Sequence, residues 1–519
     1  MTDRPFVITS AIAYGNGRPH LGQAYQYILA DATARFKRLD GYRVHFSSGM
    51  DENGWKVPVA AAGQGISAGD LIERTAARFV HLGAVLGLSF DRFVRTATAE
   101  HRHVCTELWQ RMAESGDIYL ADYAGWYAVG TDMYHSDTDT ETRTDGVRVV
   151  RSTGHTVVKL EQPLHFFRLS DYRDRLLALH EANADLVGPP SRRAEVMAEI
   201  AAGLSDVPIS CPDRGWGVPV PGGPGYRMHV WFDALASYLT AAESDAGRRT
   251  WPPDLQITSR GSIRFHGIHW PAFLMSAGLP MPGRIFAHGF LLSAGRRLSA
   301  SDGTLPDIFE LVSEYGLDTV RFFALRHGPF GLDGEFDTVA LVDLANRELA
   351  DGIGDLSLRC LTAVAERCRG RIPYPGEILE VDAAVLGQAG ELVTIWRRAY
   401  QTQDTHGAMK SIGSLVSAVH MYLAEQGSAS DLRRTDTVLY VTAEVLRVVG
   451  ILLQPVVPDT ARRLLAQLAI SADARTIAAL STPIEPGTEL LRPARVFSRI
   501  ERPPAPSTNS AVRERYSSA

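Results

Sequence analysis

The chain has little lysine and little cysteine. Only four of its 53 basic residues are lysines, so arginine carries almost all of the positive charge; they are Lys37, Lys56, Lys159 and Lys410. The four cysteines form no C-x-x-C pair, which argues against a disulfide framework and a zinc knuckle. We therefore expect no structural zinc and no other metal site, and we interpret Cys360 and Cys368 as buried apolar residues.

Long apolar runs are also missing. No segment has the roughly 18 consecutive apolar residues that a membrane span needs, and no charged-then-apolar signal peptide is present. We expect a soluble, cytoplasmic protein with no membrane partner. The net charge of −6 disfavours a strongly basic nucleic-acid binder, although local basic patches are not excluded.

The rest of the composition is that of a globular protein, with 45% hydrophobic and 22% charged residues. A chain of 519 residues is too long for one compact core and predicts about three or four domains or subdomains.

The N-terminal segment predicts a nucleotide-binding turn. A strand over Phe6–Ala11 leads through a loop rich in Gly and Pro to a helix that starts near Gly22. This is the pattern of the first strand-to-helix turn of a parallel α/β sheet, where nucleotides bind. Gly22 would let a base approach the backbone, and His20 with the helix N-terminus would donate hydrogen bonds to phosphate oxygens.

This loop resembles the H-I-G-H signature of class I aminoacyl-tRNA synthetases, and its surroundings resemble methionyl-tRNA synthetases in particular. The resemblance covers about residues 5–500. His20, Leu21 and Gly22 match the signature, while Gln23 stands where the family has a second histidine. The stretch 48–54 (SGMDENG) resembles the family's T-G-T-D-E-H-G, again with a histidine replaced, here by Asn53.

The resemblance implies a methionine pocket with a complete residue set. Asp51 would accept the ammonium group of the substrate in a charge-assisted hydrogen bond, and aromatic walls would contact the thioether. The set comprises Ile12, Tyr14, Asp51, Trp231, Ala234, Tyr238, Phe265 and His266.

The ATP-binding residues implied by the resemblance depart from the family pattern. The family's K-M-S-K-S appears as residues 297–301 (RLSAS), where Arg297 keeps a positive charge but Ala300 removes one. Its G-K-D appears as 259–261 (SRG), without the carboxylate. The implied catalytic residues are His20, Gln23, Arg297, Ser299 and Ser301; the implied ATP-binding residues are Gly22, Arg260, Gly261, Arg296 and Arg297. Mg²⁺ is expected with ATP.

Periodicity and turn residues predict the domain organisation. Strands over Phe6–Ala11 and Tyr42–Ser47 alternate with helices over Gly22–Leu39, Ala61–Leu86 and Ala99–Ser115, which indicates a parallel sheet. Short strands follow, and we expect the sheet to resume at Met228–Phe232 and to continue through Ile257–Met275. A helix is expected over Ile308–Leu325, and the apolar stripe around Leu439–Leu452 predicts a helix bundle.

The predicted fold class is therefore α/β, a Rossmann-type parallel sheet split by a connective insertion and followed by an α-helical bundle. The expected segments are a first half of the nucleotide-binding fold (1–115), the insertion (116–225), the second half (226–283), a signature-loop or stem-contact subdomain (284–345), a bundle like the family's anticodon-binding domain (346–480) and a C-terminal tail (481–519).

The tRNA-binding end is altered. The family reads the anticodon with an N-x-Y…P-W pattern, and the corresponding stretch 420–427 (HMYLAEQG) has neither reader. Because unstacked RNA bases are bound by aromatic stacking and base-edge hydrogen bonds, recognition of the methionine anticodon should be weakened.

Three hypotheses follow. The leading one is a methionyl-tRNA synthetase-like ligase that activates methionine or a related amino acid with ATP and transfers it to tRNA. The second is a tRNA-independent amino-acid ligase of specialised metabolism, for example one that forms hydrazines with a cupin partner. The third is a non-catalytic paralogue that still binds methionine, which the losses at Ala300 and Gly261 motivate.

Overall fold

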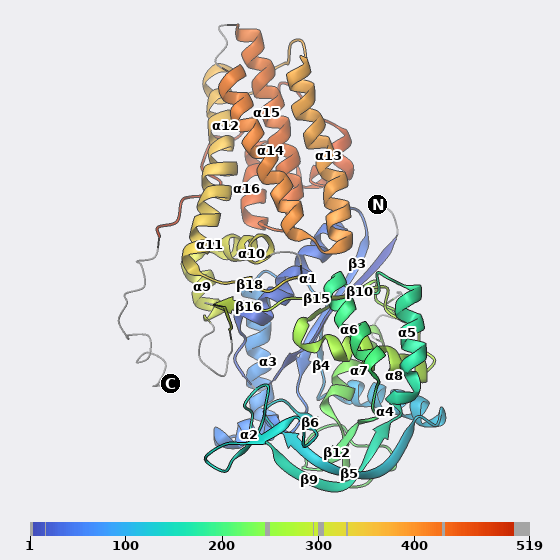
Figure 1. The fold of residues 1–519 in the computed structure, drawn as a ribbon. Helices are drawn as coiled ribbons and strands as arrows, with labels where there is room; N and C mark the ends of the chain where they lie inside the picture. Colours follow the sequence, from blue (N-terminus) through green and yellow to red (C-terminus); the bar gives the residue numbers. More distant parts are fainter. Residues whose placement is uncertain are drawn as a thin grey trace.

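The computed structural model describes residues 4–15, 17–243, 250–293, 295–298, 306–328, 331–427 and 431–502. Figure 1 shows a helix bundle at one end, a β-rich insertion at the other and a parallel sheet between them. This arrangement confirms the predicted fold class.

A seven-stranded sheet forms the middle of the molecule, in the order β10-β15-β14-β1-β3-β2, with β4 paired to β3. Every pairing in it is parallel. Its strands are β1 (Pro5–Ser10), β2 (Ala13–Tyr14), β3 (Arg43–Asp51), β4 (Arg92–Arg95), β10 (Val187–Gly188), β14 (Leu255–Ser259) and β15 (Ile285–His288). Since β1 is flanked by β3 and β14, the loop after β1 lies where the chain changes direction across the sheet, the usual ligand site of such folds.

Helices cover this sheet and connect its strands. They are α1 (Leu21–Leu39), α2 (Lys56–Gly63), α3 (Ala68–Val85), α4 (Ala99–Glu114), α7 (Val230–Glu243) and α8 (Trp270–Ser276). The expectation of one helix over Ala61–Leu86 is wrong, because Gly65 takes a left-handed φ of 66° and Ser67 caps a new helix through Asp70 N.

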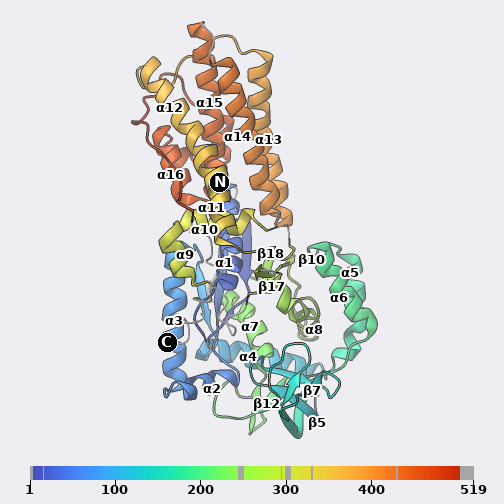
Figure 2. The same ribbon diagram turned by 60° about the vertical axis from the view of Figure 1, so that its left-hand side comes forward.

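The insertion is built on a long antiparallel pair of strands, β5 (Ile118–Ala128) and β9 (Val158–Phe167). Its smaller strands are β6 (Met133–His135), β7 (Thr140–Thr142), β8 (Arg148–Val150), β11 (Val207–Pro208), β12 (Ser210–Pro212) and β13 (Tyr226–Met228). Two helices, α5 (Arg173–Ala182) and α6 (Pro190–Ala202), lie beside the sheet in Figure 2.

The expectation that the sheet resumes at Met228–Phe232 is wrong. Met228 ends β13 of the insertion, Val230 begins α7, and the parallel sheet resumes at β14. A short apolar run does not distinguish a buried strand from a buried helix, and here the run belongs to a helix with little polar surface.

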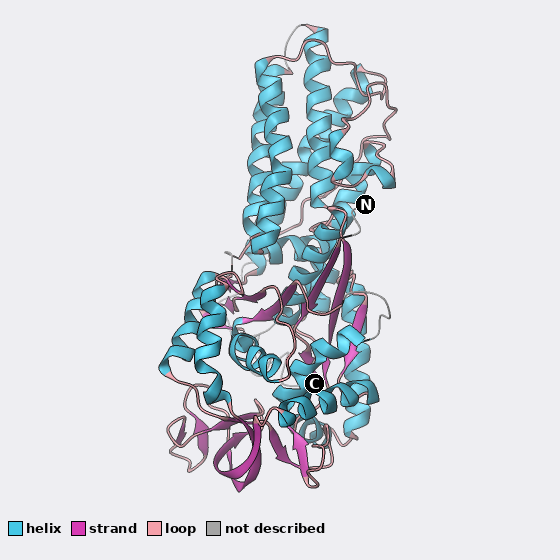
Figure 3. Cartoon of the chain, turned by 90° about the vertical axis from the view of Figure 1, so that its right-hand side faces the viewer, coloured by secondary structure: helices cyan, strands magenta, loops and turns pink. Residues whose placement is uncertain are grey.

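A subdomain and a bundle complete the chain. The subdomain contains β16 (Leu291–Ser293), β17 (Arg296–Arg297), β18 (Gly334–Glu335), α9 (Ile308–Tyr315), α10 (Leu317–Arg326) and α11 (Thr338–Ala345). Gly316, with a φ of 82°, divides the single helix expected there into α9 and α10. The bundle, all helical in Figure 3, contains α12 (Asp355–Arg367), α13 (Glu380–Thr402), α14 (Thr405–Gln426), α15 (Leu432–Leu453) and α16 (Pro458–Gln467).

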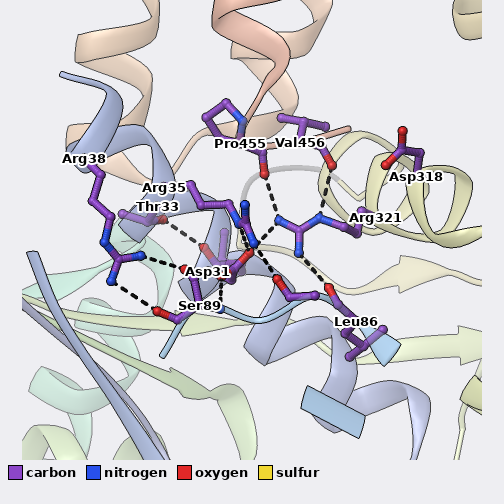
Figure 4. A network of polar contacts seen from close by, with 12 residues as sticks. Asp31, Thr33, Arg35, Arg38, Leu86, Ser89, Asp318, Arg321, Pro455 and Val456 are labelled. Carbon is purple, nitrogen blue, oxygen red and sulfur yellow. Dashed lines mark hydrogen bonds and ion pairs between the residues drawn. The ribbon is translucent and has the colours of Figure 1, made fainter. Parts of the chain in front are cut away.

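A buried ion pair joins the sheet, the subdomain and the bundle (Figure 4). Arg321 on α10, fully buried, contacts Asp31 on α1 at 2.7 Å. It also donates to the carbonyls of Pro455 (2.8 Å) and Val456 (3.2 Å), which follow α15, and of Leu86 (3.1 Å), which follows α3. One continuous hydrophobic core runs through the same region, while a second core joins the insertion to α7 and α8. The helix that begins at the signature turn is therefore tied directly to the bundle.

Candidate active site

A cavity of about 350 Å³ opens at the carboxyl edge of the sheet. Its walls come from the ends of four strands: β1, through Ala11 and the loop that follows, β3 at Asp51, β14 at Ser259 and β15 at His288. The carboxyl ends of neighbouring parallel strands meet at one edge, so residues that are up to about 280 positions apart converge here.

The signature turn forms one wall. His20 is the N-cap of α1 in extended backbone conformation, and its Nδ1 accepts from Gln23 N at 3.4 Å. In return His20 N donates to Gln23 Oε1 at 3.0 Å. This reciprocal cap fixes both side chains at the helix N-terminus, and since Nδ1 accepts, the ring proton lies on Nε2. A Cβ on Gly22 would lie 3.3 Å from the ring of His20, so glycine leaves room for that ring.

The predicted methionine residues converge on the same cavity, with one exception. Those that line it are Ile12, Tyr14, Asp51, Trp231, Ala234, Tyr238 and His266. Phe265 instead lies behind Trp231, with the two rings stacked at 3.8 Å and 3°. Tyr14 meets Trp231 edge to face at 5.9 Å, so these three aromatic rings form one packed wall.

Asp51 is the charged group of this wall and is almost fully buried. Burial raises the pKa of its carboxyl group to about 8; the cation of Lys56 and the hydrogen bond from Asn53 N (3.2 Å) offset burial only in part. A carboxylate with so few donors is suited to bind an added cation such as an ammonium group.

The part of the wall formed by Tyr238 and His266 is neutral. His266 Nδ1 donates to the carbonyl of Ser262 at 2.8 Å, so Nε2 accepts from Tyr238 OH at 2.7 Å. Burial lowers the pKa of His266 to about 4, which keeps the ring uncharged. A neutral wall of polarisable groups suits a thioether better than a charged side chain.

Only some of the predicted ATP-binding residues line the cavity. Gly261 lines the cavity, but Arg260 is directed to Asp333 (2.9 Å) and Glu195 (3.6 Å). Arg296 and Arg297 form β17, paired with β16, and Arg296 is exposed. Leu298 lines the cavity, whereas Ser299, Ala300, Ser301 and the side chain of Arg297 lie outside the described residues.

Sequence reasoning missed several lining residues. Gln26, one turn after Gln23, donates from Nε2 to the carbonyl of Ala11 at 2.7 Å and so ties α1 to the loop after β1. Its helical spacing from the signature could have revealed it. The other polar or aromatic ones are Tyr25, Tyr27, Ser259, Ser262, His288 and Phe290. Ser259 and His288 end strands, a position that itself indicates a site.

Neither a metal cluster nor a membrane span is found in the described ranges. No group of three or more His, Cys, Asp or Glu side chains there is arranged to hold a metal ion. Among the helices described, none is long and apolar enough to cross a membrane.

The stretch that corresponds to the anticodon readers ends α14. His420 is turned inward, with Nε2 at 2.9 Å from the carbonyl of Gly352, while Met421 is 63% exposed. Gly427 follows the helix, and 428–430 lie outside the described residues.

Comparisons with known proteins identify the family of this chain. The family described as tRNA synthetases class I (M) matches residues 6–361. The methionine–tRNA ligase of Mycobacterium bovis is 43% identical over 516 residues, which are 97% of this chain and 99% of the relative. The chain belongs to the methionyl-tRNA synthetase family.

Other family members agree over a similar length. The methionine–tRNA ligase of Brucella suis is 43% identical over 96% of this chain and 98% of its own. The structure of Mycobacterium tuberculosis methionyl-tRNA synthetase in complex with methionyl-adenylate matches with a TM-score of 0.92 at 42% identity, covering 96% of this chain and all of that one. The free form of the same enzyme matches with a TM-score of 0.87 at 41% identity, covering 96% of this chain and 99% of that one. The family resemblance inferred from the signatures is confirmed.

Proposed function

We propose that this protein is an ATP-dependent ligase that activates methionine to methionyl-adenylate and transfers the methionyl group to tRNA. The observation that carries the proposal is the convergence of the signature turn and the methionine residues on one cavity, in a chain 43% identical to methionine–tRNA ligases over nearly its full length.

The amino acid binds, on this proposal, with its ammonium group at Asp51. Its side chain lies between the aromatic wall of Tyr14 and Trp231 and the neutral pair of Tyr238 and His266, with Phe265 supporting Trp231 and with Ile12 and Ala234 completing the pocket. The burial of Asp51 and the neutrality of His266 support these roles.

ATP binds beside it, across the N-terminus of α1. The substrate carboxylate attacks the α-phosphorus in line as the bond to the β-phosphate oxygen breaks, and pyrophosphate leaves. His20 Nε2–H and the amide of Gln23 stabilise the negative charge that develops, and Gly22 and Gly261 allow close approach of the nucleotide. Mg²⁺ enters with the triphosphate, whose oxygens it neutralises.

The arginines and the second signature loop have a separate part in the proposal. On this proposal Arg296, Arg297, Ser299 and Ser301 bind the departing pyrophosphate, and Arg260 exchanges Asp333 for the nucleotide. Arginine supplies the positive charge that lysine supplies in the family's signature.

Transfer to tRNA is supported by the relatives and not by a feature of the cavity. It rests on the relatives, each named a methionine–tRNA or methionyl-tRNA enzyme. These relatives give no support to a tRNA-independent ligase, a cupin partner or a non-catalytic protein.

The test has two steps. Methionine-dependent exchange of pyrophosphate into ATP measures activation, and methionylation of total tRNA measures transfer. We expect both, with exchange lost in His20→Ala and increased in Gln23→His, which adds a second imidazole at the triphosphate. Absence of exchange with every amino acid would reject activation; exchange without methionylation of tRNA would reject only the acceptor.

A further inference from the structure

Behind the amino-acid site lies a buried charge cluster. It contains the carboxyl groups of Asp51, Asp132 and Asp233, which are 3%, 0% and 0% exposed, and the ammonium group of Lys56, which is 7% exposed. Asp132 and Asp51 act on the cation of Lys56, and Asp233 acts on Asp51; of the four, only Asp51 is among the residues that line the cavity.

Lys56 contacts the acid on its far side and an aromatic ring on its near side. Its Nζ lies 3.7 Å from Asp132 Oδ2 and over the ring of Tyr14. Tyr14 lines the cavity, whereas Lys56 is not among the residues that line it. The charge of Lys56 lowers the pKa of Asp51, although Lys56 itself does not line the cavity.

Asp132 comes from the insertion, at the turn between β5 and β6. It has a φ of 50°, a strained conformation for a non-glycine residue. Its Oδ1 accepts from Tyr127 OH (2.8 Å) and from Trp55 N (3.2 Å) at the start of α2. A Cβ on Gly54 would lie 2.7 Å from Asp132 Oδ2, so the insertion packs directly on the loop that follows Asp51.

The charges around Asp51 come from every element packed there. Asp233 on α7 is close to Asn53, and Glu52 is engaged by Arg95, which also binds Glu73 at 2.7 Å. The titratable and charged neighbours are Tyr14, Glu52, Glu73, Lys56, Arg95, His101, Tyr127, Asp132, His229 and Asp233. Burial lowers the pKa of both His101 and His229 to about 3 and 4, so these rings add no charge.

We propose that Lys56, anchored by Asp132 of the insertion, is a positioning residue for the amino-acid site: its cation favours the ionised form of Asp51, which is the form that pairs with the substrate's ammonium group. The inference rests on the proposed function and adds that the insertion sets the pH at which methionine binds. Burial raises the pKa of Asp51 and Lys56 lowers it, which agrees with this role.

The direction of each substitution follows from charge. Lys56→Met removes the cation, so Asp51 ionises at higher pH and the pH midpoint of kcat/KM for methionine rises, by about one unit or more. Asp132→Asn removes a neighbouring negative charge but keeps an oxygen for Trp55 N and Tyr127 OH, so the midpoint falls. Lys56→Arg keeps the charge and should stay near the wild-type midpoint.

The chain offers a matched control. Lys37 is also 7% exposed and lies over two aromatic rings, those of Phe6 and Tyr42, at 4.8 Å each, but it is in the last turn of α1, at the end away from the signature turn, and does not line the cavity. Lys37→Met therefore reproduces the loss of a buried lysine without touching Asp51.

The experiment measures kcat and KM for methionine in pyrophosphate exchange from pH 6 to 9, with thermal unfolding of each variant. We expect Lys56→Met to raise KM about tenfold at pH 7 while kcat at saturating methionine changes little, and we expect opposite midpoint shifts for Lys56→Met and Asp132→Asn. Equal midpoints for wild type, Lys56→Met and Lys37→Met would overturn the inference.

Failure of the proposed function has a different signature. If the wild type gives no exchange, the pH midpoint of each variant is measured instead from the affinity for methionine, by calorimetric titration over the same pH range. Methionine binding with opposite shifts then supports the inference although activation fails, and methionine binding with unshifted midpoints rejects it. If Lys56→Met does not fold, the shift for Asp132→Asn against Lys37→Met decides.

Discussion

Two buried carboxylates in this protein have opposite surroundings. Asp31, at the junction of the sheet and the bundle, accepts from Arg321 and Arg35 and from Ser89 N and Oγ, each at 2.7 Å. Burial raises its pKa, but the two arginines and Ser89 outweigh burial, and the pKa lies below the usual value. Asp51 has one cation and one backbone donor, and burial raises its pKa to about 8.

The number of donors around each carboxylate distinguishes a structural role from a ligand-binding role. A buried carboxylate whose donors are all supplied by the protein has no capacity left for a ligand and stabilises the fold. One that lacks donors costs stability, and a protein retains it where a ligand supplies the missing charge. Four substitutions and conditions test this contrast.

Removal of Arg321, the buried cation between the sheet and the bundle, should have the largest effect on stability. Arg321→Met leaves Asp31 with one cation and removes the donor of three carbonyls, so we expect a loss of about 3–5 kcal/mol in the free energy of unfolding. Chemical denaturation measures it. Arg35→Met, at a partly exposed residue, should cost clearly less; equal losses would show that the buried pair is not special.

Asp51→Asn should affect ligand binding instead of folding. The neutral amide cannot form an ion pair with an ammonium group, so we expect a loss of about 2–4 kcal/mol in the binding free energy of methionine. The kcat/KM for methionine in pyrophosphate exchange should therefore fall by a factor of roughly thirty to a thousand. The thermal midpoint at pH 8 should not fall. A variant that unfolds more easily than wild type at pH 8 would contradict the comparison.

The two sites should respond to pH with opposite signs. The folded pKa of Asp31 is lowered, so its stabilisation is present above the unfolded pKa of about 4 and is lost as pH falls through the folded pKa. The folded pKa of Asp51 is raised to about 8, so its cost grows as pH rises from about 4 to 8. The unfolding free energies of wild type, Asp31→Asn and Asp51→Asn check both slopes, below about pH 4 for Asp31 and from about pH 4 to 8 for Asp51.

The smallest effect is expected at an exposed ion pair that also joins the bundle to the region of α1. Arg397 on α13 binds Asp40, which follows α1, at 2.7 Å, but Arg397 is half exposed. Arg397→Ala should therefore cost less than about 1 kcal/mol, and less at high salt. A cost close to that of Arg321→Met would mean that burial does not govern these ion pairs.

The local pattern of the sequence predicted the first half of the sheet closely. The strand expected over Phe6–Ala11 is Pro5–Ser10, and the helix expected over Gly22–Leu39 is Leu21–Leu39. Both have sharp local signals, a β-branched run and a capping residue, that do not depend on distant contacts. The strand expected at Met228–Phe232 lacked such a signal and proved to be the start of a helix.

The candidate site divides in the same way. The sequence by itself determined which residue types are present, namely the signature turn at His20, the acid at Asp51 and the aromatic residues near Trp231, because motifs are local. The tertiary structure alone decided that Phe265 supports Trp231 from behind, that Arg260 binds Asp333, and that Lys56 and Asp132 stand behind Asp51. These contacts join separate elements, and whether a charge is paired or left for a ligand depends on burial and on neighbours that no local pattern specifies.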